Sequence, residues 1–86
     1  MSKTESLLVK ALASTVSISI DKISPTQTFE EYGLDSLDAV QFLLDLEELG
    51  GPVVEAETLY EYTSIRALAE FIDRGGVTAG PAFAAR

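Results

Sequence analysis

Apolar residues recur along this chain at spacings of three and four, which is the repeat expected of amphipathic helices. The first such run continues to about Val16, with Ser2 as its N-cap and Glu5 reaching back to complete a capping box. Its end, residues 15–20, is β-branched and alternating, and could form a strand when considered alone. Because the chain offers no second strand to pair with it, we expect the helix to end there and a long loop to begin.

The expected loop contains signals both for a turn and for attachment to the core. Ser24-Pro25 excludes a continuing helix, because the residue before a proline avoids helical geometry. Thr28-Phe29-Glu30-Glu31 forms a second capping box, and Gly33 suits the left-handed turn that follows it. A loop of this length must be pinned or serve a function, and we expect Phe29 and Leu34 to be its apolar anchors.

The second helical run begins at Ser36, with either Asp35 or Ser36 as its N-cap, and carries two apolar stripes. The stripe spaced to face the core comprises Ala39, Phe42, Leu43 and Leu46. The stripe on the neighbouring face, among polar residues, comprises Leu37, Val40 and Leu44. A small four-helix domain cannot easily bury both, so we predict that the second stripe is exposed as a contact surface for another protein. Complete burial of the helix is the alternative.

The third helical segment is expected to be short. Gly50-Gly51-Pro52 ends the second helix firmly. The spacing Thr58-x-x-Glu61 then predicts a third capping box and a helix over about residues 57–62. This pattern indicates little more than one helical turn before the last helix.

The last helix carries apolar residues at helical spacing over 65–72, with Thr63 or Ser64 as its cap and two glycines as its stop. Residues 76–86 are small, aperiodic and rich in glycine, proline and alanine, which is typical of a flexible tail or linker. The sequence therefore predicts one all-α domain over residues 1–75. It has three longer helices, one short helix and a large loop between the first two helices.

Composition narrows the classes of function. Eighty-six residues form one domain. The chain contains no cysteine and no histidine, which excludes disulfides, thiolate metal sites and the usual base at neutral pH. We therefore do not expect a self-contained enzyme. No apolar run approaches membrane-spanning length, and we expect a cytoplasmic protein without membrane attachment.

Charge is distributed unevenly along the chain, whose formal net charge is −8. The segment from Glu30 to Glu61 contains ten acids and no lysine or arginine, whereas the remaining residues carry four acids and six bases, a net of +2. Nucleic acid is a poor partner for such a surface, because binding it depends on cations that neutralise phosphates. Basic patches on other proteins are suitable partners, although a merely solvated acidic face is the alternative.

The block Gly33-Leu34-Asp35-Ser36-Leu37-Asp38 places a serine hydroxyl where the loop becomes a helix, with two aspartates beside it. The simplest alternative is that this serine only caps the helix. The block, together with the lengths of the surrounding loop and helices, resembles the modification site of acyl and peptidyl carrier proteins. The resemblance extends from about Glu5 to about Asp73 and implies the four-helix carrier-protein bundle.

In carrier proteins this serine receives 4′-phosphopantetheine from coenzyme A through a phosphopantetheinyl transferase, and the thiol of the arm carries intermediates as thioesters. The resemblance therefore implies that Ser36 is a covalent attachment site and that the chain is not an enzyme. A phosphodiester on Ser36 would lie at the positive end of a helix, which tolerates an anion. No histidine or lysine lies nearby in sequence to activate the hydroxyl, which suits a substrate of another enzyme better than a catalyst.

The resemblance also implies a partner-facing surface along the second helix. The positions that match the family are Asp35, Leu37, Asp38, Val40, Gln41, Leu44, Asp45 and Glu48. Gln41 departs from the acid that is common in fatty-acid carriers, while Gly51-Pro52-Val53 and residues 58–62 look like carriers of bacterial modular polyketide systems with separate acyltransferases. The expected partners are acyltransferases, ketosynthases and other polyketide enzymes with basic docking patches, and we expect the carrier to be monomeric.

Other classes of function stay open. A fatty-acid carrier, a peptidyl carrier and an unmodified helical docking module would share this pattern. A divalent-cation binder or hydrolase could use Asp35 and Asp38, which lie one helical turn apart. The alternating Asp/Asn-Gly loop of a calcium site is missing, and carboxylates on a convex helix lack a pocket to tune them. We therefore expect no metal site.

Overall fold

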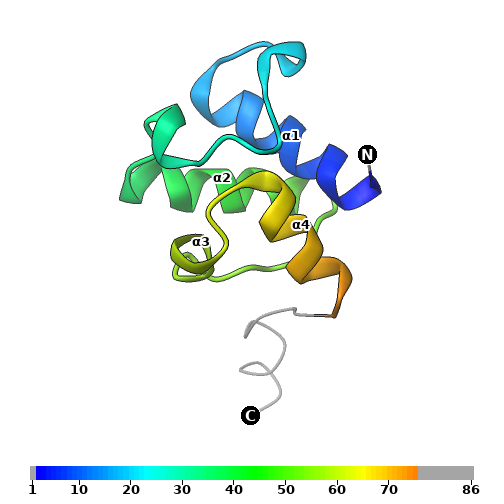
Figure 1. The fold of residues 1–86 in the computed structure, drawn as a ribbon. Coiled ribbons are helices and arrows are strands. Elements are labelled where there is room, and N and C mark those ends of the chain that lie inside the picture. Colours follow the sequence, from blue (N-terminus) through cyan, green and yellow to red (C-terminus); the bar gives the residue numbers. More distant parts are fainter. Residues whose placement is uncertain (1, 76–86) are drawn as a thin grey trace.

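A computed structural model describes residues 2–75 of the chain, and every regular element within them is helical. The longer elements are α1 (Lys3–Val16), α2 (Ser36–Glu48) and α4 (Ile65–Asp73), whereas α3 (Thr58–Glu61) is a single turn. Two 3-10 turns, η1 (Ile20–Lys22) and η2 (Glu30–Tyr32), lie in the loop between α1 and α2 (Figure 1). The predicted all-α fold, with three longer helices and one short helix, is confirmed.

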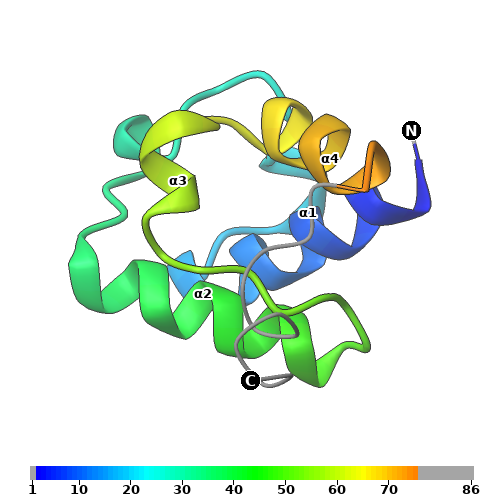
Figure 2. The same cartoon turned by 90° about the horizontal axis from the view of Figure 1, so that it is seen from below.

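The core lies where α1 packs against both α2 and α4. Figures 1 and 2 show α3 at the end of the bundle where α2 begins. The largest fully buried side chains are Leu8 and Leu12 of α1, Phe42 and Leu46 of α2, and Ile65 and Leu68 of α4. Each pair is spaced by one helical turn, so each helix presents one apolar side to the centre. Burying such a side chain contributes about 2 kcal/mol.

Three helices begin with side-chain caps that the sequence predicts. The accepting side chains are those of Ser2, Asp35 and Ser64, each bonded to the backbone N–H three residues later, at 3.0, 2.9 and 3.2 Å. Asp35, and not Ser36, is therefore the N-cap of α2. Each cap satisfies one of the amides that a helix start leaves without an intrahelical partner.

The predicted role of Glu5 in the first capping box is wrong. Glu5 is buried, and its Oε2 lies 3.3 Å from the Nε of Arg66 at the start of α4. Its Oε1 has no hydrogen-bond partner within residues 2–75. An ion pair with a distant helix has therefore replaced the local contact, because α4 packs against this end of α1.

The predicted capping box at Thr58 is also wrong. Glu57 takes the N-cap position of α3 with no side-chain bond, and Thr58 is buried as the first helical residue. The amides of residues 58–60 donate instead to the backbone carbonyls of residues 55–57, at 3.0–3.1 Å. The preceding turn thus satisfies the donors that a cap would serve.

The loop between α1 and α2 is pinned to the start of α4. The Phe29 N–H donates to the Thr63 carbonyl at 2.9 Å, and the Arg66 N–H donates to the Pro25 carbonyl at 2.8 Å. The Phe29 ring is buried and packs on Phe42, with ring centroids 5.4 Å apart. Phe29 is therefore an anchor of the loop, as predicted.

The second capping box forms in full and directs the chain into α2. Thr28 Oγ1 accepts the N–H of Glu31 at 3.2 Å, and Glu31 Oε1 accepts the N–H of Thr28 at 3.0 Å. Gly33 follows with a φ of +79°, a conformation that suits glycine. Leu34 then packs partly buried against the core, which confirms it as the second anchor.

The end of α1 is a helix end and not a strand. Ser17 adopts a left-handed conformation with a φ of 58°, and the Ile18 N–H donates to the Ala13 carbonyl at 3.1 Å.

Within the described part of the chain, no helix is long and apolar enough to cross a membrane. The predicted tail, residues 76–86, lies outside the described residues, so the division at residue 75 stays a prediction.

Candidate functional site

Ser36 is the exposed first residue of α2. The cap of this helix is the neighbouring Asp35, whose Oδ1 accepts the Asp38 N–H. Within residues 2–75 the Ser36 hydroxyl makes no hydrogen bond. Asp35 therefore caps the helix, and the hydroxyl of the adjacent Ser36 is exposed and accessible to another molecule.

The surroundings of Ser36 combine a helix dipole with two carboxylates. The first backbone amides of α2 point toward the loop and have no partners inside the helix, so this end carries a partial positive charge. Asp35 and Asp38 place negative charge on either side of the serine. The site can therefore tolerate a phosphate ester while attracting cationic side chains of another protein.

The two stripes of α2 have opposite surroundings. Ala39, Phe42, Leu43 and Leu46 are buried, with Phe42 and Leu46 fully enclosed. Leu37, Val40 and Leu44 are exposed over 81%, 49% and 49% of their surfaces. The predicted exposed stripe is confirmed, and complete burial of the helix is excluded.

The polar residues predicted on the partner face fall into two groups. Asp35, Gln41 and Glu48 are exposed, whereas Asp38 is half-buried. Asp45 is also half-buried, and it accepts two hydrogen bonds, from Thr15 Oγ1 and from Gln41 Nε2, both at 2.9 Å. The Asp45 carboxylate therefore fastens α2 to α1 and is less available to a partner than the exposed Glu48.

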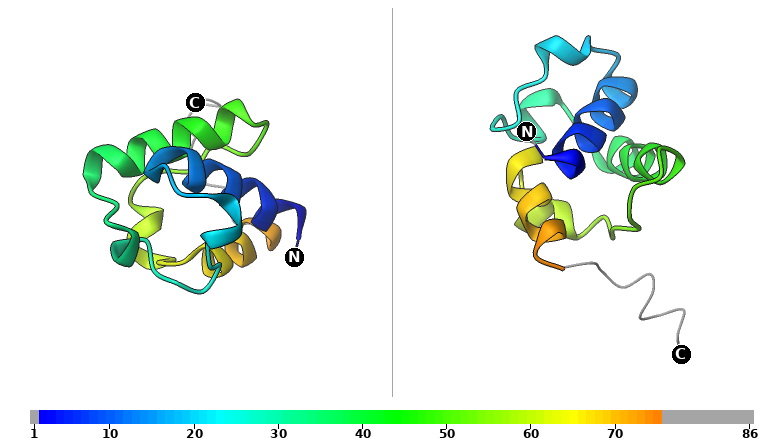
Figure 3. Two further views of the ribbon diagram at one scale, coloured as in Figure 1. Left: turned by 90° about the horizontal axis from the view of Figure 1, so that it is seen from above. Right: turned by 90° about the vertical axis from the view of Figure 1, so that its right-hand side faces the viewer.

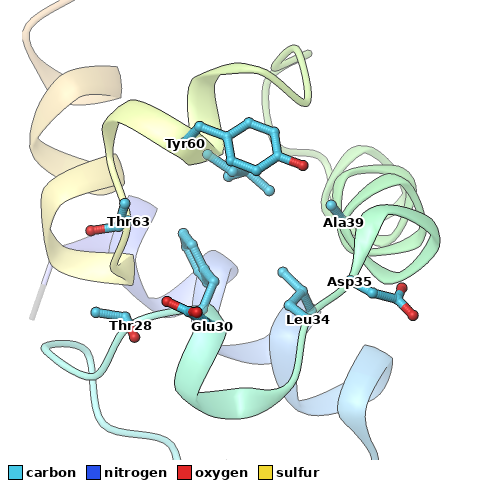
Figure 4. A pocket seen from close by; sticks show the side chains of 9 residues that line it. Thr28, Glu30, Leu34, Asp35, Ala39, Tyr60 and Thr63 are labelled. Carbon is cyan, nitrogen blue, oxygen red and sulfur yellow. The ribbon is translucent and has the colours of Figure 1, made fainter.

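A cavity of about 430 Å³ opens beside Ser36, between the loop, the start of α2 and α3. Its lining residues are Thr28, Phe29, Glu30, Leu34, Asp35, Ala39, Leu59, Tyr60 and Thr63. In Figure 4 the Ala39 methyl group and the Leu34 side chain point inward, whereas the Asp35 carboxylate points away. Tyr60 lies across one side and is 75% exposed. Sequence reasoning missed this cavity, because its walls come from separate segments that no local spacing connects.

Comparison with known proteins places these features in a wider context. The family described as "Phosphopantetheine attachment site" matches residues 6–72. The chain is 30% identical over 73 residues to polyketide synthase PksR of Bacillus subtilis (strain 168), an alignment that covers 85% of this chain and 3% of PksR. It is 38% identical over 52 residues to acyl carrier protein 2, chloroplastic, of Spinacia oleracea, covering 60% of this chain and 40% of that protein. The chain thus spans less than half the length of these two relatives.

Among solved structures, the fold is similar to a free-standing peptidyl carrier protein from an uncharacterized secondary metabolic pathway of Acinetobacter baumannii. The TM-score is 0.73 and the identity is 32%, over 84% of this chain and 90% of that one. The two chains therefore share the same helical fold over most of their lengths.

Proposed function

The chain belongs to the phosphopantetheine-attachment family of carrier proteins, and we propose that Ser36 is the residue that bears its 4′-phosphopantetheine arm. The observation that carries the proposal is the exposed hydroxyl at the start of α2, which no other described residue engages. When bound, the arm supplies a thiol that holds acyl groups as thioesters. A chain without cysteine has no thiol of its own.

The residues around Ser36 fit such a group. The positive end of α2 stabilises a phosphodiester by about 0.3–1 kcal/mol. Repulsion from the exposed Asp35 and the half-buried Asp38 costs about 1 kcal/mol or less each, because water screens it, and a covalent bond holds the group against this cost. Beyond the phosphate, the cavity offers the apolar side chains of Leu34 and Ala39 to the arm or to its cargo, with hydroxyls at its rim.

Attachment requires an external base, because the neighbours of Ser36 in α2 are carboxylates and apolar residues. Neither a histidine nor a lysine lies among these neighbours, so α2 offers the hydroxyl no strong base at neutral pH. We assign the activation of the hydroxyl to a phosphopantetheinyl transferase. The chain is its substrate.

The partner face is the exposed stripe of α2 with its flanking acids. Leu37, Val40 and Leu44 offer apolar contact, and Asp38 and Glu48 offer charge to a basic patch. Exposed charges of this kind raise association rates more than they raise affinity. Such docking is fast and reversible, as a carrier that visits several enzymes requires.

The pathway that we propose is polyketide biosynthesis, with acyltransferases and ketosynthases as partners. The match to PksR supports it, because the aligned region includes most of this chain. A peptidyl carrier is the second candidate, favoured by the similarity to the Acinetobacter structure over 90% of that chain. Loading separates them: a malonyl-type acyltransferase should charge the modified chain in the first case, and an amino-acid adenylation domain in the second.

The attachment site is tested by intact mass. Incubation with coenzyme A and a promiscuous transferase should add the mass of one phosphopantetheine to the chain. Ser36→Ala should abolish this gain, whereas Ser14→Ala, at an exposed serine of α1, should retain it. A gain that persists in Ser36→Ala would refute the assignment.

A further inference from the structure

A second cavity lies between α1 and η1. The cavity beside Ser36 is lined in part by α3, and η1 and α3 are on opposite faces of the molecule (Figures 1 and 3). Its volume is about 360 Å³, and its lining residues are Ser6, Val9, Lys10, Ile20, Asp21 and Ile23. Val9 and Ile23 are buried, whereas Ile20 is 53% exposed. None of these residues belongs to α2 or lines the cavity beside Ser36.

The charged side chains at this cavity carry a small net positive charge, in contrast to those of α2. Lys10 lines the cavity and Lys22 belongs to η1, and both are exposed. Glu5 is buried in its ion pair, so it adds no exposed negative charge here. Asp21 also lines the cavity and adds one exposed negative charge, and its carboxylate accepts a hydroxyl hydrogen bond at 2.8 Å from its own loop. The exposed charges at this cavity are therefore two lysines and one acid, whereas α2 carries acids and no lysine or arginine.

We propose that this α1/η1 face, defined by the six lining residues and Lys22, is a second docking surface. Its occupant is an acidic segment of another protein that inserts an apolar side chain beside Ile20. The volume is at the lower end of the range for ligand pockets, about 300–1,000 Å³, and is sufficient for one or two large apolar side chains. Lys10 and Lys22 supply the complementary charge that orients the segment.

The consequence is a division of tasks between two faces of opposite charge. Basic partners dock on α2 beside Ser36, whereas the acidic segment docks on the α1/η1 face and leaves α2 free. A partner could therefore hold the carrier in place while enzymes exchange at its arm, which raises their effective concentration. This inference does not depend on modification of Ser36.

Two peptides test the proposal against the isotopically labelled full chain. One has acidic residues around a central Leu-Phe pair, and the other has lysine in place of each acid. The acidic peptide should shift the backbone amides of Val9, Lys10 and residues 20–23 and leave those of α2 unmoved. The lysine peptide should do the reverse. Unmoved amides at 20–23 at millimolar acidic peptide, or equal shifts at both faces, would overturn the proposal.

Substitutions then separate charge from fold. Lys10→Glu with Lys22→Glu should lower the affinity for the acidic peptide about tenfold or more at low salt. The matched control is Lys3→Glu with Arg74→Glu, which makes the same change of net charge at exposed positions outside the cavity and should change affinity by less than about twofold. Equal losses in the two double variants would show a nonspecific charge effect and contradict the proposal.

Ile20→Ala provides a third variant, because an exposed side chain can be truncated without disturbing the core. This variant should bind the acidic peptide more weakly at both low and high salt. Its unfolding midpoint and its loading at Ser36 should be unchanged. Unaltered affinity would contradict the proposal. Failure of the wild-type chain to accept phosphopantetheine would refute only the attachment site.

The same experiment also distinguishes two other occupants of this face. Shifts of the cavity amides with the concentration of the chain alone would assign the face to a second copy. Shifts caused by Phe83→Ser, at the aromatic residue of the segment 76–86, would assign it to the chain's own terminus. Either result would overturn the proposal of an acidic partner segment.

Discussion

The two apolar stripes of α2 consist of similar residues and have opposite consequences. Leu43 and Leu44 are adjacent in sequence, yet Leu43 is buried and Leu44 is 49% exposed. The buried stripe joins α2 to α1, whereas the exposed stripe leaves apolar surface in water beside Ser36. Apolar side chains contribute favourable free energy only when they are removed from water. The buried stripe therefore stabilises the folded domain, whereas the exposed stripe can contribute only when another protein covers it. Hydrophobicity alone therefore does not identify the core of this helix.

The largest expected effect is a loss of stability when the buried stripe is truncated. Leu43→Ala should lower the free energy of unfolding by about 2–5 kcal/mol, because it creates a cavity between packed helices. Leu44→Ala, the matched control, should lower it by about 0.5 kcal/mol or less. Chemical denaturation of both variants measures the difference. Equal losses would mean that the two leucines share one environment.

A smaller effect is expected when the exposed stripe is changed. It should alter association with a partner enzyme and leave folding unchanged. Leu37→Asp should reduce the rate of phosphopantetheine transfer to Ser36 about tenfold at limiting chain concentration, because it removes apolar contact at the proposed partner face. Its unfolding midpoint should match that of the wild type, since Leu37 is 81% exposed. Initial rates by mass spectrometry provide the measurement. An unchanged rate would remove Leu37 from the face.

The two acids Asp45 and Glu48, near the end of α2, should differ in their contribution to stability, as the buried and exposed stripes do. Asp45→Ala should lower the free energy of unfolding by about 1 kcal/mol, because it removes the acceptor for Gln41 and one of the two acceptors of the Thr15 hydroxyl, the other being the Ala11 carbonyl. Glu48→Ala should leave stability unchanged within about 0.5 kcal/mol, since Glu48 is exposed. Thermal unfolding of the two variants compares them. Equal stability would mean that the Thr15 bond contributes nothing.

The smallest effect is electrostatic. Glu48→Lys should slow association with a basic partner a few-fold at low ionic strength, and the difference should vanish at high salt, because exposed charges are screened within about 10 Å at 0.1 M. Stopped-flow association rates at two salt concentrations measure this. A difference that persists at high salt would indicate a direct contact at residue 48 in place of long-range steering.

Much of this molecule is predictable from short-range patterns. The helical spacing around Phe42 identifies the buried stripe, and the caps at Ser2, Asp35 and Ser64 follow from residue type and position. The capping box at Thr28 forms as predicted. These features depend on residues within one helical turn of each other, so the sequence alone contains the information.

Other features required the packed structure. Glu5 pairs with Arg66, 61 residues away, and not with the cap beside it. Asp45 accepts a hydrogen bond from Thr15, 30 residues away, which no spacing within α2 indicates. In both cases a longer-range partner, brought close by helix packing, engages a side chain that local rules assign elsewhere.

The sequence by itself determined where the helices lie, which side of α2 enters the core, and that a serine opens this helix without a base beside it. Only the tertiary structure decided which acids are exposed, how the long loop is fastened to α4, and where the two cavities lie. The physical reason is range. Helical periodicity and capping act over three or four residues, whereas cavities and buried ion pairs arise where separate segments meet.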